Sequence, residues 1–398
     1  MLKNKKAWLV IFLYGICSLT FHFCFAEVGK GDDAYFISMI NQQTLGEFLQ
    51  HRWNTWSSRL VIETVVVSIL SLPAIFWKIL DVMISMLIAY LFLGMIFYEK
   101  NAEEVMGWSG FLLFFYDFRE VSSAGWMNTT IFYWWVFAAG MLACLPLYLH
   151  YRKAAVKPWT YWVAVPACIF AANQEQAAVV LICSCIYLWG LFAFEKRKVP
   201  NYVYLVLGIA LLEILIAFFC PGNRMRMKMS VEYWLPEFAE LNLFQKGMLG
   251  WHGLLRTLFE DINWLYLGVS GSLALTVLKK NKRWIEKLLG IIPFAAVVGQ
   301  AIGAQVAFPL ESKGMYLFYT VICLCFAAVM YLVWGKTKKF THMLAILLIG
   351  VISKVSMGMS PTVWASKERT SIFFLFALMA IGICSIEELG KTRKKSVP

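Results

Sequence analysis

Long runs of apolar residues, separated by short polar connectors, repeat along the whole chain. A helix that crosses a bilayer needs about 20 mostly apolar residues. By this criterion the sequence predicts about twelve crossings, with eleven or thirteen as the neighbouring counts, at 7–25, 60–77, 79–98, 129–149, 158–172, 177–194, 201–219, 262–278, 284–303, 315–334, 341–358 and 370–386. We therefore expect an all-α, polytopic transmembrane helical bundle that forms one integral membrane domain over residues 1–398.

Two apolar segments have an alternative interpretation. Residues 7–25 follow three lysines and end near Cys24-Phe25-Ala26, which resembles the cleavage site of a signal peptide, but the run is long enough to favour an uncleaved anchor. Residues 106–118 are too few to span a bilayer and end beside Arg119 and Glu120. We expect this segment to form an interfacial or re-entrant helix at the outer face.

Composition agrees with a membrane protein and excludes several other classes. Hydrophobic residues make up 60% of the chain and charged residues 15%, whereas soluble domains have about 45–50% and about 25%. This composition argues against a disordered chain, a soluble enzyme and a disulfide scaffold. The ten cysteines lie in or beside apolar segments without metal-ligand spacing, so we interpret them as small packing residues.

The distribution of charge predicts the orientation of the bundle. The net charge is +12, and one face of the predicted topology carries 22 of the 36 Lys and Arg residues but only 5 of the 24 acidic residues. Cytoplasmic loops carry this excess of Lys and Arg. We therefore expect both termini in the cytoplasm, including a basic tail at 387–398, and we assign the positive charge to the membrane topology rather than to nucleic acid binding. The longer polar segments, among them 26–58 and 220–261, then lie at the outer face.

The first outer loop contains two adjacent acidic residues, Asp32 and Asp33. A carboxylate at a membrane surface can accept a proton from an attacking hydroxyl group, or can bind a divalent metal such as Mg²⁺ or Mn²⁺. The alternative is that these residues cap an amphipathic interfacial helix expected over 34–50. Arg59 also has two interpretations, because it can bind a phosphate group or pair with Glu63 one helical turn away.

Four short motifs, together with the acidic pair after the first crossing, resemble the GT-C superfamily of membrane glycosyltransferases. They are Trp-Asn-Thr-Trp-Ser-Ser-Arg at 53–59, Trp126-Met127-Asn128-Thr129-Thr130, Asn173-Gln174-Glu175-Gln176 and Pro221-Gly222-Asn223-Arg224. In order along the chain they are similar to a poorly characterised bacterial branch of that superfamily. The resemblance implies an enzyme of the bacterial inner membrane. It would transfer a sugar from a polyprenyl-phosphate donor to a cell-envelope glycan or glycolipid, at the extracytoplasmic face.

The resemblance and the residue chemistry together suggest three groups of site residues. Asp32 or Asp33 would act as the catalytic base or hold the metal. Cations would bind the donor phosphate, namely Arg59, Arg224, Arg226, Lys367 and Arg369. Polar and aromatic side chains would bind the sugar or the acceptor, namely Trp126, Asn128, Asn173 and Glu175.

A different class of function remains open. Glu213 and Lys354 fall inside predicted crossings, where ionisable residues are costly and are usually paired or functional. They are in the outer halves of their helices, so they could pair with each other, line a cavity, or form an ion path. The alternative to an enzyme is therefore a flippase, a polymerase for lipid-linked glycans or another multi-pass transporter, and a non-catalytic scaffold is a third possibility.

Overall fold

Helices account for all the regular structure in the computed structural model, which describes residues 5–24, 29–98, 126–303, 312–366 and 368–395. The outer-face helix expected over 106–118 lies outside the described residues. In chain order the helices are α1 (Lys5–Cys24), α2 (Asp32–Ile40), α3 (Leu45–Thr55), α4 (Leu60–Leu70), α5 (Ala74–Ile96), α7 (Trp126–Thr129), the π-helix η2 (Thr130–Trp135), α8 (Val136–Tyr151), α9 (Pro158–Ala172), α10 (Glu175–Phe194), α11 (Asn201–Phe219), α12 (Pro221–Trp234), the 3-10 helix η3 (Pro236–Glu240), α13 (Leu243–Phe259), α14 (Trp264–Lys280), α15 (Trp284–Gly303), α16 (Lys313–Trp334), α17 (Lys338–Val355), the 3-10 helices η4 (Ser356–Met359) and η5 (Glu368–Ser371), and α18 (Ile372–Lys395).

Nine helices in the described ranges are long and apolar enough to cross a membrane, which indicates a multi-pass membrane protein. Three of the twelve expected crossings form shorter helices, because α4 has 11 residues, α9 has 15 and α14 has 17. At about 1.5 Å per residue, α4 is only about 17 Å long, compared with a hydrocarbon core of about 30 Å. The expected crossing at 60–77 is divided by a turn before Pro73, and the longer helix α5 begins directly after it.

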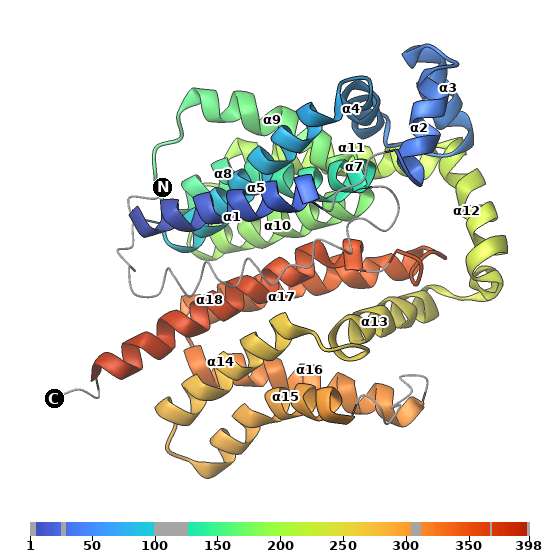
Figure 1. The fold of residues 1–398 in the computed structure, drawn as a ribbon. Coiled ribbons are helices and arrows are strands. Elements are labelled where there is room, and N and C mark those ends of the chain that lie inside the picture. Colours follow the sequence, from blue (N-terminus) through green and yellow to red (C-terminus); the bar gives the residue numbers. More distant parts are fainter. Residues whose placement is uncertain (1–4, 25–28, 99–125, 304–311, 367, 396–398) are drawn as a thin grey trace.

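The helices are arranged around the C-terminal helix α18 (Figure 1). Helices α1, α5 and α8 to α11 lie on one side of α17 and α18, and α13 to α16 lie on the other. Of the nine candidate crossings, α18 is the most buried, and it packs against α14 and α17. This central position explains why its apolar residues, such as Leu378 and Ile381, are almost completely hidden.

Small side chains form a second core among α8, α9, α10 and α11. Its buried members include Ala143, Ala164, Cys168, Ala171 and Cys185. Small residues let helices approach closely where lipid provides no hydrophobic driving force. The ten cysteines are free, and those in this core have the packing role expected from the sequence.

The two ends of the bundle differ in structure. Helix α1 begins and α18 ends at the same end of the molecule, whereas α2, α3 and α12 cover the opposite end (Figure 1). The single interfacial helix expected over 34–50 is instead two helices, α2 and α3, because Thr44 and Glu47 form a capping box that starts a new helix. The chain therefore turns back at the end that contains the candidate site.

Candidate functional site

The acidic pair begins helix α2, and its two carboxylates face different surroundings. Gly31 precedes the pair with φ of 56°, a conformation that glycine adopts without strain. Asp33 is fully buried, and its carboxylate accepts the backbone N–H groups of Met127 at 3.4 Å and Asn128 at 2.9 Å. Asp33 therefore caps a helix, as one interpretation of the sequence proposed, but that helix is α7 and not the one that contains Asp33 itself.

Asp32 is an exposed side chain beside this cap. The protein packed against its carboxyl group raises the pKa of Asp32, and the positive charges of Arg369 and Arg52 act in the opposite direction. Burial likewise raises the pKa of Asp33, against the effect of its backbone hydrogen bonds. Asp32 thus combines access to solvent with a pKa above the ordinary range, which suits a carboxylate that exchanges protons.

Arg52 organises the two interfacial helices and was not assigned a role from the sequence. Its guanidinium group makes two hydrogen bonds to the Glu63 carboxylate, at 2.8 and 2.7 Å, and both side chains are buried. Four aromatic rings from α2, α3 and the following turn lie within about 6 Å of it, those of Tyr35, Phe36, Phe48 and Trp56. The pair between Arg59 and Glu63, one of the two interpretations of Arg59, is therefore replaced by a bidentate pair between Arg52 and Glu63.

Arg59 instead contacts Glu175, at the start of α10. Its Nε donates to a Glu175 carboxylate oxygen at 2.7 Å, and Arg226 of α12 approaches the other oxygen at 3.6 Å. Burial alone would lower the pKa of Arg59, but the interactions of its guanidinium group with Glu175, Tyr133 and Glu63 together outweigh burial and raise that pKa. Burial and the charge of Arg59 together lower the pKa of Arg226. One carboxylate thus serves two arginines.

Two aromatic rings of the π-helix η2 complete this part of the site. The Arg59 guanidinium carbon lies 5.8 Å from the centre of the Phe132 ring, and that of Arg369 lies 5.9 Å from the Tyr133 ring. Tyr133 also acts electrostatically on both Arg59 and Arg226. Three arginines from distant segments therefore meet around neighbouring rings, and we call Arg59, Arg226 and Arg369 the arginine cluster.

Hydrogen bonds connect the first turn of α10 with the end of α17 and with η5, which precedes α18. The Gln176 amide donates to the carbonyl oxygens of Ser353 at 3.0 Å and Thr370 at 2.6 Å. Lys354 donates to the Thr370 hydroxyl at 3.0 Å. These bonds hold Arg369, the neighbour of Thr370, beside the end of the bundle that contains Glu175. Lys354 is thus placed by its contact with Thr370, and Glu213 accepts a hydrogen bond from Asn173 at 3.0 Å.

The side chain of Asn173 forms hydrogen bonds within the protein through both its oxygen and its amide group. Its side-chain oxygen accepts the N–H groups of Val61 and Ile62, each at 3.1 Å, and so satisfies the start of α4. Its amide donates to Ser58 and Glu213. These bonds favour a structural role for Asn173, in place of the sugar contact that the sequence suggested.

The motif at 221–224 is also mainly structural. Gly222 packs so closely on α3 that an added Cβ would lie 2.4 Å from the Trp56 nitrogen. Asn223 donates to the Ser58 hydroxyl at 2.9 Å and accepts from the Ser58 backbone at 3.3 Å. These contacts attach α12 to the turn before α4, and they place Arg226 close to Glu175.

The remaining predicted residues are placed as follows. Arg224 is exposed on α12, and Asn128 is buried beside Asp33 with a side-chain oxygen that has no hydrogen-bond partner among the described residues. Lys367 and the side chain of Trp126 lie outside the described residues. The structure therefore brings Asp32, Asp33, Asn128, Glu175 and the arginine cluster to one end of the bundle.

The donor atoms around the acidic pair do not form a cage for a metal. No group of three or more His, Cys, Asp or Glu side chains that could hold a metal ion occurs in the described ranges. Both Asp33 oxygens already accept backbone N–H groups. The described residues around Asp32 and Asp33 therefore do not provide the set of ligands that a divalent metal needs.

Sequence reasoning missed Arg52, the rings of Phe132 and Tyr133, and a buried pair between His22 and Asp81. The available signal was strongest for Asp81, an acidic residue inside an apolar run.

No family model, curated protein or solved structure matches this chain.

Proposed function

We propose that this protein is a membrane glycosyltransferase of the GT-C type. In this proposal it transfers a sugar from a polyprenyl-phosphate donor to a hydroxyl group of a cell-envelope glycan or glycolipid, at the extracytoplasmic face of a bacterial inner membrane. The site would be the end of the bundle formed by α2, α3, α12 and the starts of α10 and α18.

The observation that carries this proposal is the excess of positive charge at Glu175. Arg59 and Arg226 share its single carboxylate, and Arg369 lies over the ring of Tyr133, next to the Phe132 ring that Arg59 contacts. A phosphate group would supply the missing negative charge, and guanidinium groups bind it through paired N–H donors. Such a cluster also stabilises a phosphate that leaves with an additional negative charge.

Asp32 is the base in this mechanism. Its carboxylate takes the proton of the acceptor hydroxyl while that oxygen forms a bond to the anomeric carbon. The bond between this carbon and the donor phosphate oxygen breaks, and polyprenyl phosphate leaves with the electron pair. Attack from the face opposite the leaving group inverts the anomeric configuration. Asp33, which is bound to α7, positions its neighbour rather than reacting.

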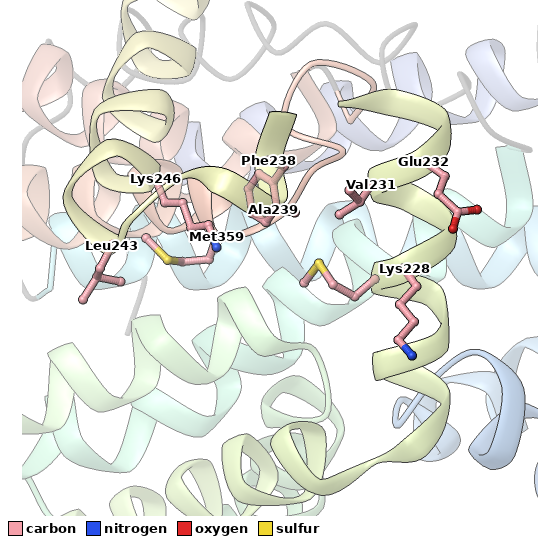
Figure 2. Close-up of a pocket in the computed structure, with 9 residues that line it drawn as sticks. Lys228, Val231, Glu232, Phe238, Ala239, Leu243, Lys246 and Met359 are labelled. Atoms are coloured by element: carbon pink, nitrogen blue, oxygen red, sulfur yellow. The ribbon is translucent and has the colours of Figure 1, made fainter. Parts of the chain in front are cut away.

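A mostly apolar cavity beside α12, the helix that carries Arg226, supports a lipid-linked donor (Figure 2). It has a volume of about 540 Å³, and Lys228, which contributes to its wall, lies on α12 two residues after Arg226. Figure 2 shows Leu243, Lys246 and Met359 on one side of the cavity and Val231 of α12 on the other. A hydrocarbon chain would fit between these side chains.

Sugar transfer in nanodiscs tests the proposal. Wild-type protein would be supplied with polyprenyl-phosphate sugars and a cell-envelope glycan fraction, and release of polyprenyl phosphate would be measured. We expect Asp32→Asn to reduce the rate by about 10²–10⁴-fold. The matched control is Asp261→Asn, which removes an exposed aspartate elsewhere and should leave the rate unchanged.

Two outcomes would contradict this mechanism. If Asp32→Asn transfers sugar as fast as wild type, Asp32 is not the base. If wild type consumes no donor, the transporter interpretation takes first place. A parallel sample with EDTA, restored with Mg²⁺ or Mn²⁺, would detect a metal requirement.

A further inference from the structure

Two ionisable side chains meet inside the membrane-spanning part of the bundle, away from the proposed site. His22 of α1 and Asp81 of α5 lie 2.7 Å apart, from Nε2 to Oδ2, and both are at most 1% exposed. Ionisable residues in this setting are costly and are usually paired or functional. The mechanism proposed above uses neither of them.

The second oxygen of Asp81 contacts the π-helix η2. It accepts the indole N–H of Trp135 at 2.5 Å. The adjacent Trp134 donates to the Ser85 hydroxyl at 3.0 Å, one turn further along α5. Ser85 also accepts a hydrogen bond from Ser18 of α1, at 3.1 Å. The end of η2 is therefore fixed to both α5 and α1.

The start of η2 is fixed by the same helix. Trp77 of α5 donates its indole N–H to the Thr130 hydroxyl at 3.0 Å, and Thr130 donates to the Met127 carbonyl. π-Helical turns are rare and often occur at functional sites. Hydrogen bonds to α5 at both ends of η2 explain how this uncommon geometry is held.

Between these two anchors, η2 presents Phe132 and Tyr133 to Arg59 and Arg369. We infer that the buried pair of His22 and Asp81 positions the arginine cluster, by fixing through Trp135 the π-helix on whose rings two of its arginines rest. The inference builds on the proposed function, because it assigns positioning residues to the same anion site. His22, Asp81 and Trp135 touch no substrate in this assignment.

A fluorine label tests the positioning without any ligand. Replacing Tyr133 with 3-fluorotyrosine gives a ¹⁹F signal that reports the surroundings of this ring, and Arg369→Ala identifies the shift caused by losing the arginine. We expect Trp135→Phe and Asp81→Leu to move the signal. Asp81→Asn should retain most of its position, because the amide oxygen still accepts from Trp135 and its NH₂ group still faces the His22 ring.

The matched control is Trp251→Phe, which removes another indole hydrogen bond, to Thr320, between α13 and α16. In sugar transfer, Trp135→Phe should raise the KM for the donor about 10-fold and change kcat by less than about 3-fold, as expected when binding geometry alone is altered. A ¹⁹F signal that is unmoved in Trp135→Phe and Asp81→Leu would overturn the inference. A signal that moves in a protein without transferase activity would support the positioning and contradict the proposed function.

Discussion

At the scale of single residues, Asp32 and Asp33 are adjacent in the sequence but have different surroundings and different proposed roles. Asp33 is enclosed by the backbone of α7, whereas Asp32 is exposed and lies within the electrostatic reach of Arg369 and Arg52. Adjacent residues of a helix point about 100° apart, so one carboxylate can be part of the fold while the next faces a substrate.

The pH dependence of transfer should report Asp32. Transfer requires the ionised base, so the rate rises as pH increases through the Asp32 pKa, which burial places above the ordinary value. Arg369 lowers this pKa, so Arg369→Gln should move the acid limb of kcat/KM to higher pH. Arg256→Gln, which changes a surface cation paired with Glu260, is the control. An acid limb that is identical in both variants and in wild type would contradict the assignment.

Asp33 predicts a pH-dependent effect on stability. Its pKa is raised in the folded state, so its contribution to folding is fully present below the unfolded pKa of about 3.9 and is lost as pH rises through the folded pKa. We expect Asp33→Asn to gain stability relative to wild type between pH 4 and pH 7, because the amide oxygen still accepts the N–H groups of α7. Thermal unfolding in nanodiscs at both pH values measures the difference, and a difference that is independent of pH would refute it.

At the scale of elements, the site depends on a few close contacts between helices. The start of α12 lies against α3 because Gly222 has no side chain. The buried pair of Arg52 and Glu63 then connects α3 to α4. These contacts decide where Arg226 and Arg59 lie, although neither contact includes the arginine cluster itself.

The close approach at Gly222 makes a direct prediction. Gly222→Ala places a methyl group against backbone atoms of α3, so α12 must move and Arg226 with it. We expect a lower Tm and a KM for the donor raised by about 10-fold or more, equivalent to about 1.4 kcal/mol. Gly208→Ala in α11 meets no atom within 4 Å and is the matched control. Equal behaviour of the two variants would contradict this packing.

The buried pair of Arg52 and Glu63 gives a second prediction at this scale. Glu63→Gln leaves the Arg52 charge buried without its carboxylate, and breaking such a pair costs about 3–5 kcal/mol. The double variant Arg52→Leu with Glu63→Leu should recover part of this loss, since it leaves no buried charge. Unfolding of wild type and the two variants in detergent compares them, and a double variant less stable than Glu63→Gln would exclude this explanation.

The apolar pattern predicted the all-helical, multi-pass architecture, but it could not fix where helices end. Hydropathy does not show that a turn divides 60–77 before Pro73, or that Thr44 starts a new helix within 34–50. For the site, residue chemistry identified Asp32, Glu175, Arg226 and Arg369 as candidates. It could not identify their partners, because the contact of Arg59 with Glu175 joins residues 116 positions apart.

At the scale of the whole molecule, α1 begins and α18 ends at the end of the bundle opposite the site (Figure 1). From the basic connectors we predict that the end where α1 begins faces the cytoplasm and that the site faces outward. Epitope tags inserted after Lys196 and after Glu240 test this orientation. Antibody should reach the tag at Glu240 in intact spheroplasts and the tag at Lys196 only after permeabilisation, and the reverse result would invert the topology.

The central position of α18 has a consequence for biosynthesis. When the ribosome has synthesised every helix up to α17, the chain already contains Asp32, Arg59, Glu175 and Arg226, but not Arg369. The Thr370 carbonyl that Gln176 binds, 194 residues earlier in the sequence, is also still missing. The segment made after α17 therefore completes the arginine cluster, and a chain that has been made only up to α17 holds Asp32 without the Arg369 charge that lowers the pKa of its carboxyl group.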